Sequence, residues 1–150
     1  MSDATDVIDA ALGVAEGSKL DMLRAARPEA RARTQSSYAA LFDPAEPGAL
    51  TRAERFGAAL RVAELEEAGS LAAHYRARLV GETPAVRAAA IARHVELLTR
   101  SPSAATRADL AKLAEAGLTS PEIVTLSQIV AFVAYQVRVV ASLALIGGTP

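Results

Sequence analysis

The side chains best suited to acid–base chemistry in this sequence are its two histidines, His74 and His94. A histidine can act as a general base near neutral pH, and Tyr75, directly after His74, could hold a developing oxyanion. We therefore predict His74 and Tyr75 as candidate catalytic residues. The alternative for His74 is a surface or core histidine with one hydrogen bond. His94 lies between Arg93 and Glu96 on a mixed helix, which is more typical of a structural residue.

Arg138 follows a long stretch without charged residues, which would place it inside an apolar helix. A buried unpaired charge costs several kcal/mol, so Arg138 is expected to meet a carboxylate. The predicted partner, in the core or across a subunit interface, is one of Glu54, Glu64 and Glu67. The alternative is that Arg138, with Tyr135 on a neighbouring face, binds an anionic substrate.

Composition excludes several kinds of chemistry. The chain contains no cysteine, so it has neither disulfides nor thiol redox chemistry. The two histidines are twenty residues apart without carboxylates at ligand spacing, so no metal and no cofactor are expected. The net charge of −1 gives no basic surface for nucleic acid. The densest basic stretch is predicted to be a solvated helix face, and it contains Arg24, Arg27, Arg31 and Arg33.

The elements that must position these residues are helices. Ala, Leu, Arg and Glu lose little conformational freedom in a helix, and no strand alternation competes. Capping boxes begin at Thr51 and Thr106, and Ser120-Pro121-Glu122 has a cap, a proline and an acid in order. The sequence therefore predicts an all-α fold of about seven helices, with a long buried helix at the C-terminal end.

A break with two prolines and a glycine at 43–48 separates two parts of one 150-residue domain. We expect a helical extension at 1–47 and a core at 51–148. The N-terminus is acidic and has no leader pattern, so a cytoplasmic location is expected. Segment 123–146 is long enough to cross a membrane, but Arg138, Gln128 and Gln136 argue for a buried core or oligomer helix instead, with no membrane partner.

Two stretches carry a family resemblance. The first is Leu60-Arg61-Val62-Ala63-Glu64-Leu65 followed by Ala72-Ala73-His74-Tyr75. The second is Leu118–Val124 followed by Ala131–Val140. Together they resemble the carboxymuconolactone decarboxylase and alkylhydroperoxidase D superfamily, and its peroxidase-related branch above all. Residues 6–44 resemble one subfamily whose members are usually paired with an alkylhydroperoxidase-domain protein.

The redox members of that superfamily carry a Glu, eleven residues, Cys-x-x-Cys, three residues and a His. One thiolate attacks, the second resolves the disulfide, and the His and Glu move protons. Three alignments of that motif to this chain remain open. They place at the four positions either Phe56, Ala68, Leu71 and Tyr75, or Arg55, Glu67, Ser70 and His74, or Glu54, Glu66, Gly69 and Ala73. Every alignment loses both thiols, so the resemblance implies the scaffold and argues against the peroxidase mechanism.

The resemblance implies a non-redox member of the superfamily, acting as a structural or regulatory partner of an alkylhydroperoxidase-domain protein. It also implies a homo-oligomer, a dimer, trimer or hexamer, built by packing helices. Two alternatives stay open. One is a lyase or decarboxylase-type enzyme on a small carboxylated substrate, with His74 as acid/base and Tyr75 or Arg138 holding an oxyanion. The other is a protein that binds a small ligand between its helices.

Overall fold

Several helices in this chain begin at capping signals that the sequence carries. The computed structural model describes residues 6–148, and within that span all regular structure is helical. The helices are α1 (Val7–Leu12), α2 (Lys19–Ala25), α3 (Pro28–Phe42), α4 (Arg52–Leu65), α5 (Gly69–Arg78), α6 (Ala85–Arg100), a 3₁₀ turn η1 (Pro102–Ala104), α7 (Arg107–Glu115) and α8 (Ser120–Gly147). The all-α prediction is confirmed, as is the long C-terminal helix.

Side-chain caps set the starts of the central helices. Thr51 and Glu54 form the predicted capping box of α4. For α8 the cap is Thr119, one residue before the predicted Ser120, because Glu122 accepts hydrogen bonds from the Thr119 backbone N–H and hydroxyl, both at 2.7 Å. This box satisfies donors that the first turn of a helix would otherwise leave unpaired.

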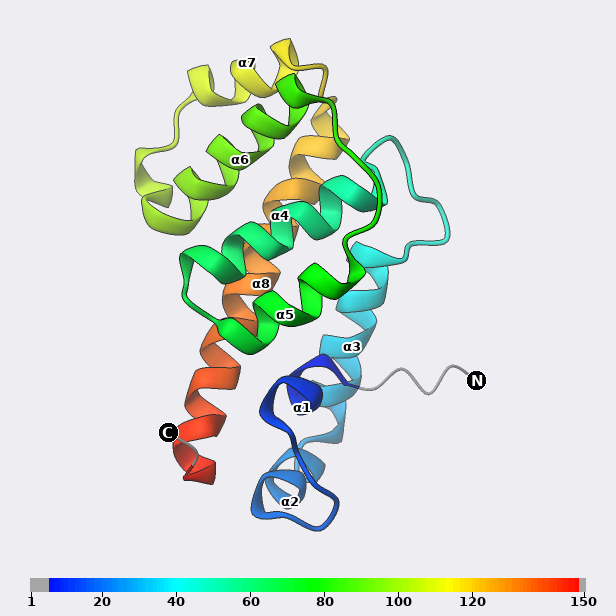
Figure 1. Cartoon of the computed structure of the whole chain (residues 1–150), viewed down its shortest axis with the longest axis vertical. Coiled ribbons are helices and arrows are strands. Elements are labelled where there is room, and N and C mark those ends of the chain that lie inside the picture. The colour runs from blue at the N-terminus through cyan, green and yellow to red at the C-terminus, as the bar shows by residue number, and fades with distance from the viewer. Residues whose placement is uncertain (1–5, 149–150) are drawn as a thin grey trace.

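Helix α4 lies at the centre of the molecule, with α5 and α6 along its two sides and α8 behind it in the view of Figure 1. α7 packs on α6, and α1 and α2 lie against the C-terminal half of α8. The core between these helices is apolar, with its largest fully buried side chains including Phe42, Phe56, Leu71, Tyr75 and Leu126. Few aromatic residues are available, and most of them gather where α3, α4 and α5 meet.

Only one face of α8 is buried. Its inner face carries Leu126, Ile129, Val133 and Gln136, but only 22% of its most apolar 18-residue window is buried. In the part of the chain that the structure describes, α8 is the one helix long and apolar enough to span a membrane, judged by length and composition alone. The prediction that this helix is buried nearly all round therefore holds for one side of it.

An ion network fixes the N-terminal helices. Arg24 bonds the Asp6 carboxylate at 2.8 Å and the Asp9 carboxylate at 2.7 Å, and Arg31 also pairs with Asp9. The Arg24 side chain is only 9% exposed. The predicted solvated basic face is thus wrong for Arg24, because Asp6 and Asp9 bind its guanidinium. A third acidic side chain, Asp21, lies 4.0 Å from the guanidinium of Arg31.

Candidate functional site

The predicted catalytic pair lies on α5, which faces α3 and α8. His74 is half-buried, and its Nε2 is 2.9 Å from the Tyr38 hydroxyl of α3. The imidazole also contacts the Tyr38 and Tyr75 rings edge-on, at centroid distances of 5.6 and 5.1 Å. One ring nitrogen is therefore already bonded, and the ring is held by two aromatic neighbours.

Burial and the nearby Arg78 guanidinium lower the pKa of His74 to about 4. Burial raises the pKa of Tyr38, although Arg78 and Arg52 oppose the shift. Both side chains are consequently neutral at physiological pH. The pair is a neutral imidazole bonded to a protonated phenol, and it carries no charge.

Tyr75 points the other way, into the core between α5 and α8. It is 0% exposed and donates its hydroxyl proton to Oε1 of Gln136, which is also 0% exposed. Burial raises the pKa of Tyr75 far above its ordinary value, with Tyr38 adding to the shift. Among the described residues, Nε2 of Gln136 has no hydrogen-bond partner. Tyr75 thus serves a buried contact in this structure, and its predicted catalytic role stays a prediction.

The residues predicted to bind substrate lie on the outer face of α8. Arg138 is exposed, and its guanidinium donates to the carbonyl of Ala134 on the same helix, at 2.7 Å. Tyr135 is 43% exposed, and its hydroxyl is 3.1 Å from that of Thr34 on α3. Both line a shallow groove formed by α8 alone, which does not include His74. The structure therefore does not bring His74 and Arg138 to one cavity.

The prediction that Arg138 pairs with a glutamate in the core is wrong. Because Arg138 faces outward, its charge stays hydrated, and within residues 6–148 it pairs with no carboxylate. Of the three partners expected for it, Glu54 is bound by Arg87 of α6 instead. Glu64 pairs with Arg76. Pairing of Arg138 across a subunit interface stays a prediction.

Arg87 joins the ends of three helices. Its guanidinium bonds Glu54 of the α4 capping box at 2.6 and 3.2 Å and Glu122 of the α8 box at 2.8 Å. It also donates to the carbonyl of Gly117, just after α7, at 2.8 Å. We call these four residues the Arg87 node. Charge-assisted hydrogen bonds of this kind are about twice as strong as neutral ones.

The positions that the redox motif would occupy hold structural residues. In the first alignment, Phe56, Leu71 and Tyr75 are buried, and the rings of Phe56 and Tyr75 are 6.3 Å apart. In the second, Arg55 is buried and donates to the carbonyls of Leu50, Leu41 and Pro47, which hold the loop before α4. In the third, Glu54 belongs to the Arg87 node. No alignment places a reactive pair at the thiol positions.

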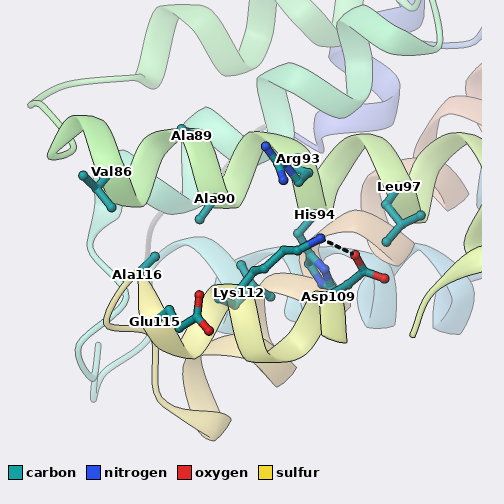
Figure 2. Close-up of a pocket in the computed structure, with 11 residues that line it drawn as sticks. Val86, Ala89, Ala90, Arg93, His94, Leu97, Asp109, Lys112, Glu115 and Ala116 are labelled. Atoms are coloured by element: carbon teal, nitrogen blue, oxygen red, sulfur yellow. Dashed lines mark ion pairs between the residues drawn. The ribbon is translucent and has the colours of Figure 1, made fainter. Parts of the chain in front are cut away.

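A pocket that the sequence did not suggest lies between α6 and α7 (Figure 2). It has a volume of about 250 Å³, and His94 lines it while being only 5% exposed. Arg93, Asp109, Lys112 and Glu115 supply its polar groups. The signal that could have found it is the apolar spacing Ile91-His94-Val95, which puts a histidine on the buried face of α6.

Comparisons with known proteins bear on the fold. No protein-family model matches the chain, and neither does any curated protein. Among solved structures, the chain is similar to the crystal structure of an uncharacterized peroxidase-related protein from Silicibacter sp. TM1040. The TM-score is 0.66 at 17% identity, over 83% of this chain and 73% of the other. The chain therefore has an all-α fold of the kind seen in that peroxidase-related protein.

Proposed function

We propose that the chain is a non-redox binding protein built on a peroxidase-related fold, which acts by packing the exposed face of α8 against a helix of another subunit. The observation that carries the proposal is the long apolar face that α8 leaves uncovered. The absence of cysteine supports it, because both thiols of the peroxidase mechanism are missing.

The uncovered face is a regular stripe, which we call the α8 stripe. Its members are spaced alternately by four and three residues, the repeat of helices that pack side by side. They are Val124, Gln128, Ala131, Tyr135, Arg138, Ser142 and Leu145. Val124 is 56% exposed and Leu145 is 80% exposed. The stripe combines these apolar side chains with the polar Gln128, Arg138 and Ser142. Exposed apolar patches bordered by polar residues mark interaction sites.

The composition of the stripe favours a protein helix over lipid as the surface that covers it. Arg138 lies on it, and a charge in the bilayer costs about 2.5–3.5 kcal/mol on insertion scales. Ala131 and Ser142 are small, so another helix backbone can approach closely. Tyr135, half exposed, offers the large aromatic surface typical of interface centres.

The partner that we propose is an alkylhydroperoxidase-domain protein from the same organism. We propose that the stripe also packs against a second copy of this chain. The resemblance of residues 6–44 to a subfamily paired with such proteins supports the first. The self-complementary small and apolar residues of the stripe support a homo-oligomer, a dimer, trimer or hexamer.

The experiment is a light-scattering mass measurement of the chain alone and mixed with that partner. We expect a complex above the monomer mass, which Ala131→Glu on the stripe disrupts. Ala108→Glu, at an exposed position of α7, is the matched control and should leave the complex intact. A monomer at all concentrations, with no mixed complex, would contradict the proposal. The proposal would also be overturned if the chain floated with lipid vesicles in a density gradient and formed no protein complex.

A lyase-type enzyme remains the alternative function and receives less support. It would need His74 as acid/base beside an anion-binding Arg138. The two residues line no common cavity, and Nε2 of His74 is bonded to Tyr38.

A further inference from the structure

The pocket between α6 and α7 has a buried ring nitrogen with no hydrogen-bond partner in the part of the chain that the structure describes. His94 extends from α6 toward α7, beside Asp109 and Lys112 (Figure 2). Its Nδ1 is shielded from solvent and has no hydrogen-bond partner among residues 6–148. Buried polar atoms are nearly always paired with protein, water or a ligand, so this one calls for a partner.

The hydrogen bonds around His94 fix which nitrogen carries the proton. Nε2 is 3.1 Å from Oγ of Ser127. That hydroxyl donates its only proton to the carbonyl of Ile123, at 2.8 Å. Since Ser127 has no second proton, Nε2 of His94 must be the donor toward Oγ. Nδ1 is consequently the unprotonated nitrogen, and its lone pair needs a hydrogen-bond donor.

Burial keeps the imidazole in this neutral form. It lowers the pKa of His94, and Asp109 opposes the shift only in part. The charged groups that line the pocket are Arg93 on the same helix as His94 and Asp109, Lys112 and Glu115 on α7. Two are positive and two negative, so the rim has no net charge, and it favours neither anions nor cations.

The rest of the pocket is apolar. Its walls are formed by Val86, Ala89, Ala90, Leu97, Leu113 and Ala116. A volume of about 250 Å³ is small for a ligand pocket, which limits the ligand to a compact molecule. The Lys112–Asp109 ion pair beside the ring is 3.5 Å long, and the Lys112 side chain is 51% exposed. Exposed pairs of this kind contribute little, so Lys112 can move aside.

From these features we infer that the α6/α7 pocket binds a small neutral molecule with an apolar body and one hydroxyl or N–H group, which donates to Nδ1 of His94 once the side chains that shield this nitrogen move aside. The apolar walls hold the body and the histidine fixes its orientation. This site is separate from the α8 stripe, so the inference does not depend on the proposed partner function.

Phenol and toluene are the probes, because they have similar shapes and differ in the hydroxyl donor. The chain has only two histidines, so ¹⁵N-histidine labelling gives separate signals for His94 and His74. We expect phenol to shift the Nδ1 resonance of His94 while the His74 resonances stay in place. Because one net hydrogen bond is at stake, phenol should bind about fivefold more tightly than toluene.

Two variants test the location. Ala89→Leu adds bulk at an exposed position that lines the pocket, and it should abolish the phenol-induced shift. Ala85→Leu, an exposed position on the same helix outside the pocket lining, should leave that shift unchanged. The inference is overturned if phenol and toluene bind equally or not at all. It is also overturned if the His94 shift persists in Ala89→Leu. A third contrary result is an Nδ1 resonance that phenol never moves, which is expected if a tightly bound water already donates to that nitrogen.

Discussion

Replacing Arg87 by methionine keeps most of the aliphatic stem and removes the guanidinium of the Arg87 node. The Glu54 and Glu122 side chains are only 1% and 5% exposed, so neither can recover its hydration easily. Removing one partner of a buried pair costs about 3–5 kcal/mol. Each glutamate keeps its bonds to the threonine of its own capping box, and Arg87 itself is 20% exposed, which lets water in. We therefore expect a loss within that range for the two carboxylates together, not twice the range.

The pH dependence makes this prediction specific. Burial alone would raise the pKa of Glu54 and of Glu122, but hydrogen bonds from Arg87 and from Thr51 or Thr119 outweigh it and lower both. Groups with lowered pKa values stabilise the fold above their unfolded value near 4.5, and this stabilisation is lost as the pH falls through the folded values. Without Arg87 both pKa values rise relative to those of the natural chain, because the threonine hydrogen bonds alone then oppose burial. The variant therefore loses less stability on acidification than the natural chain, so the difference in unfolding free energy between them narrows from pH 7 to pH 4.

The assay is urea unfolding followed by circular dichroism, for both chains at pH 7 and pH 4. Arg93→Met, at an exposed arginine of the same helix, is the control and should change the free energy of unfolding by less than about 0.5 kcal/mol. If Arg87→Met is unfolded at pH 7, the triple variant with Glu54→Gln and Glu122→Gln still tests the reasoning, because it removes both orphaned charges. A loss below about 1 kcal/mol at pH 7, or a gap that stays the same at both pH values, would refute it.

Three further predictions concern other buried polar groups. Tyr75→Phe leaves Gln136 without its partner and should cost about 1–3 kcal/mol in urea unfolding, with recovery on adding Gln136→Leu; unchanged stability would contradict this. His74 has a folded pKa of about 4 against 6.5 unfolded, so stability should fall as the pH drops from 6.5 through 4, less so in His74→Gln. An NMR titration midpoint near 6.5 would disprove that prediction. Arg24→Ala should lower the free energy of opening α1 by about 1.5–3 kcal/mol and so speed its amide hydrogen exchange. Equal exchange rates in the two chains would show that the ion network does not stabilise α1.

The helices were predictable because their signals are local. The capping box of Thr51 with Glu54, the proline at the start of α3 and the left-handed Gly117 after α7 each act within a few residues. The observed cap of α8 differs from the predicted one by one residue because Thr119 and Ser120 are both good caps. The Glu122 carboxylate decides between them, since it accepts hydrogen bonds from Thr119.

The contacts of the candidate site were not predictable, because they join residues far apart in the sequence. Arg138 sits among apolar residues in the sequence, which suggested burial, but the direction in which it points depends on which side of α8 meets α4. Arg87, on a helix of mixed character, reaches Glu54 and Glu122 only once three helices are packed. His94 looked structural for the same reason: its pocket exists only when α7 lies against α6.

The Arg87 node also bears on how the chain is made. Its members, Glu54, Arg87, Gly117 and Glu122, leave the ribosome in that order over nearly half of the chain. Until α6 has emerged, Glu54 has its threonine cap but no cation, and until Glu122 follows, Arg87 is only partly paired. Helix α4 therefore gains its full set of polar partners late, and the helices that the node joins should fold as one unit once α8 is available.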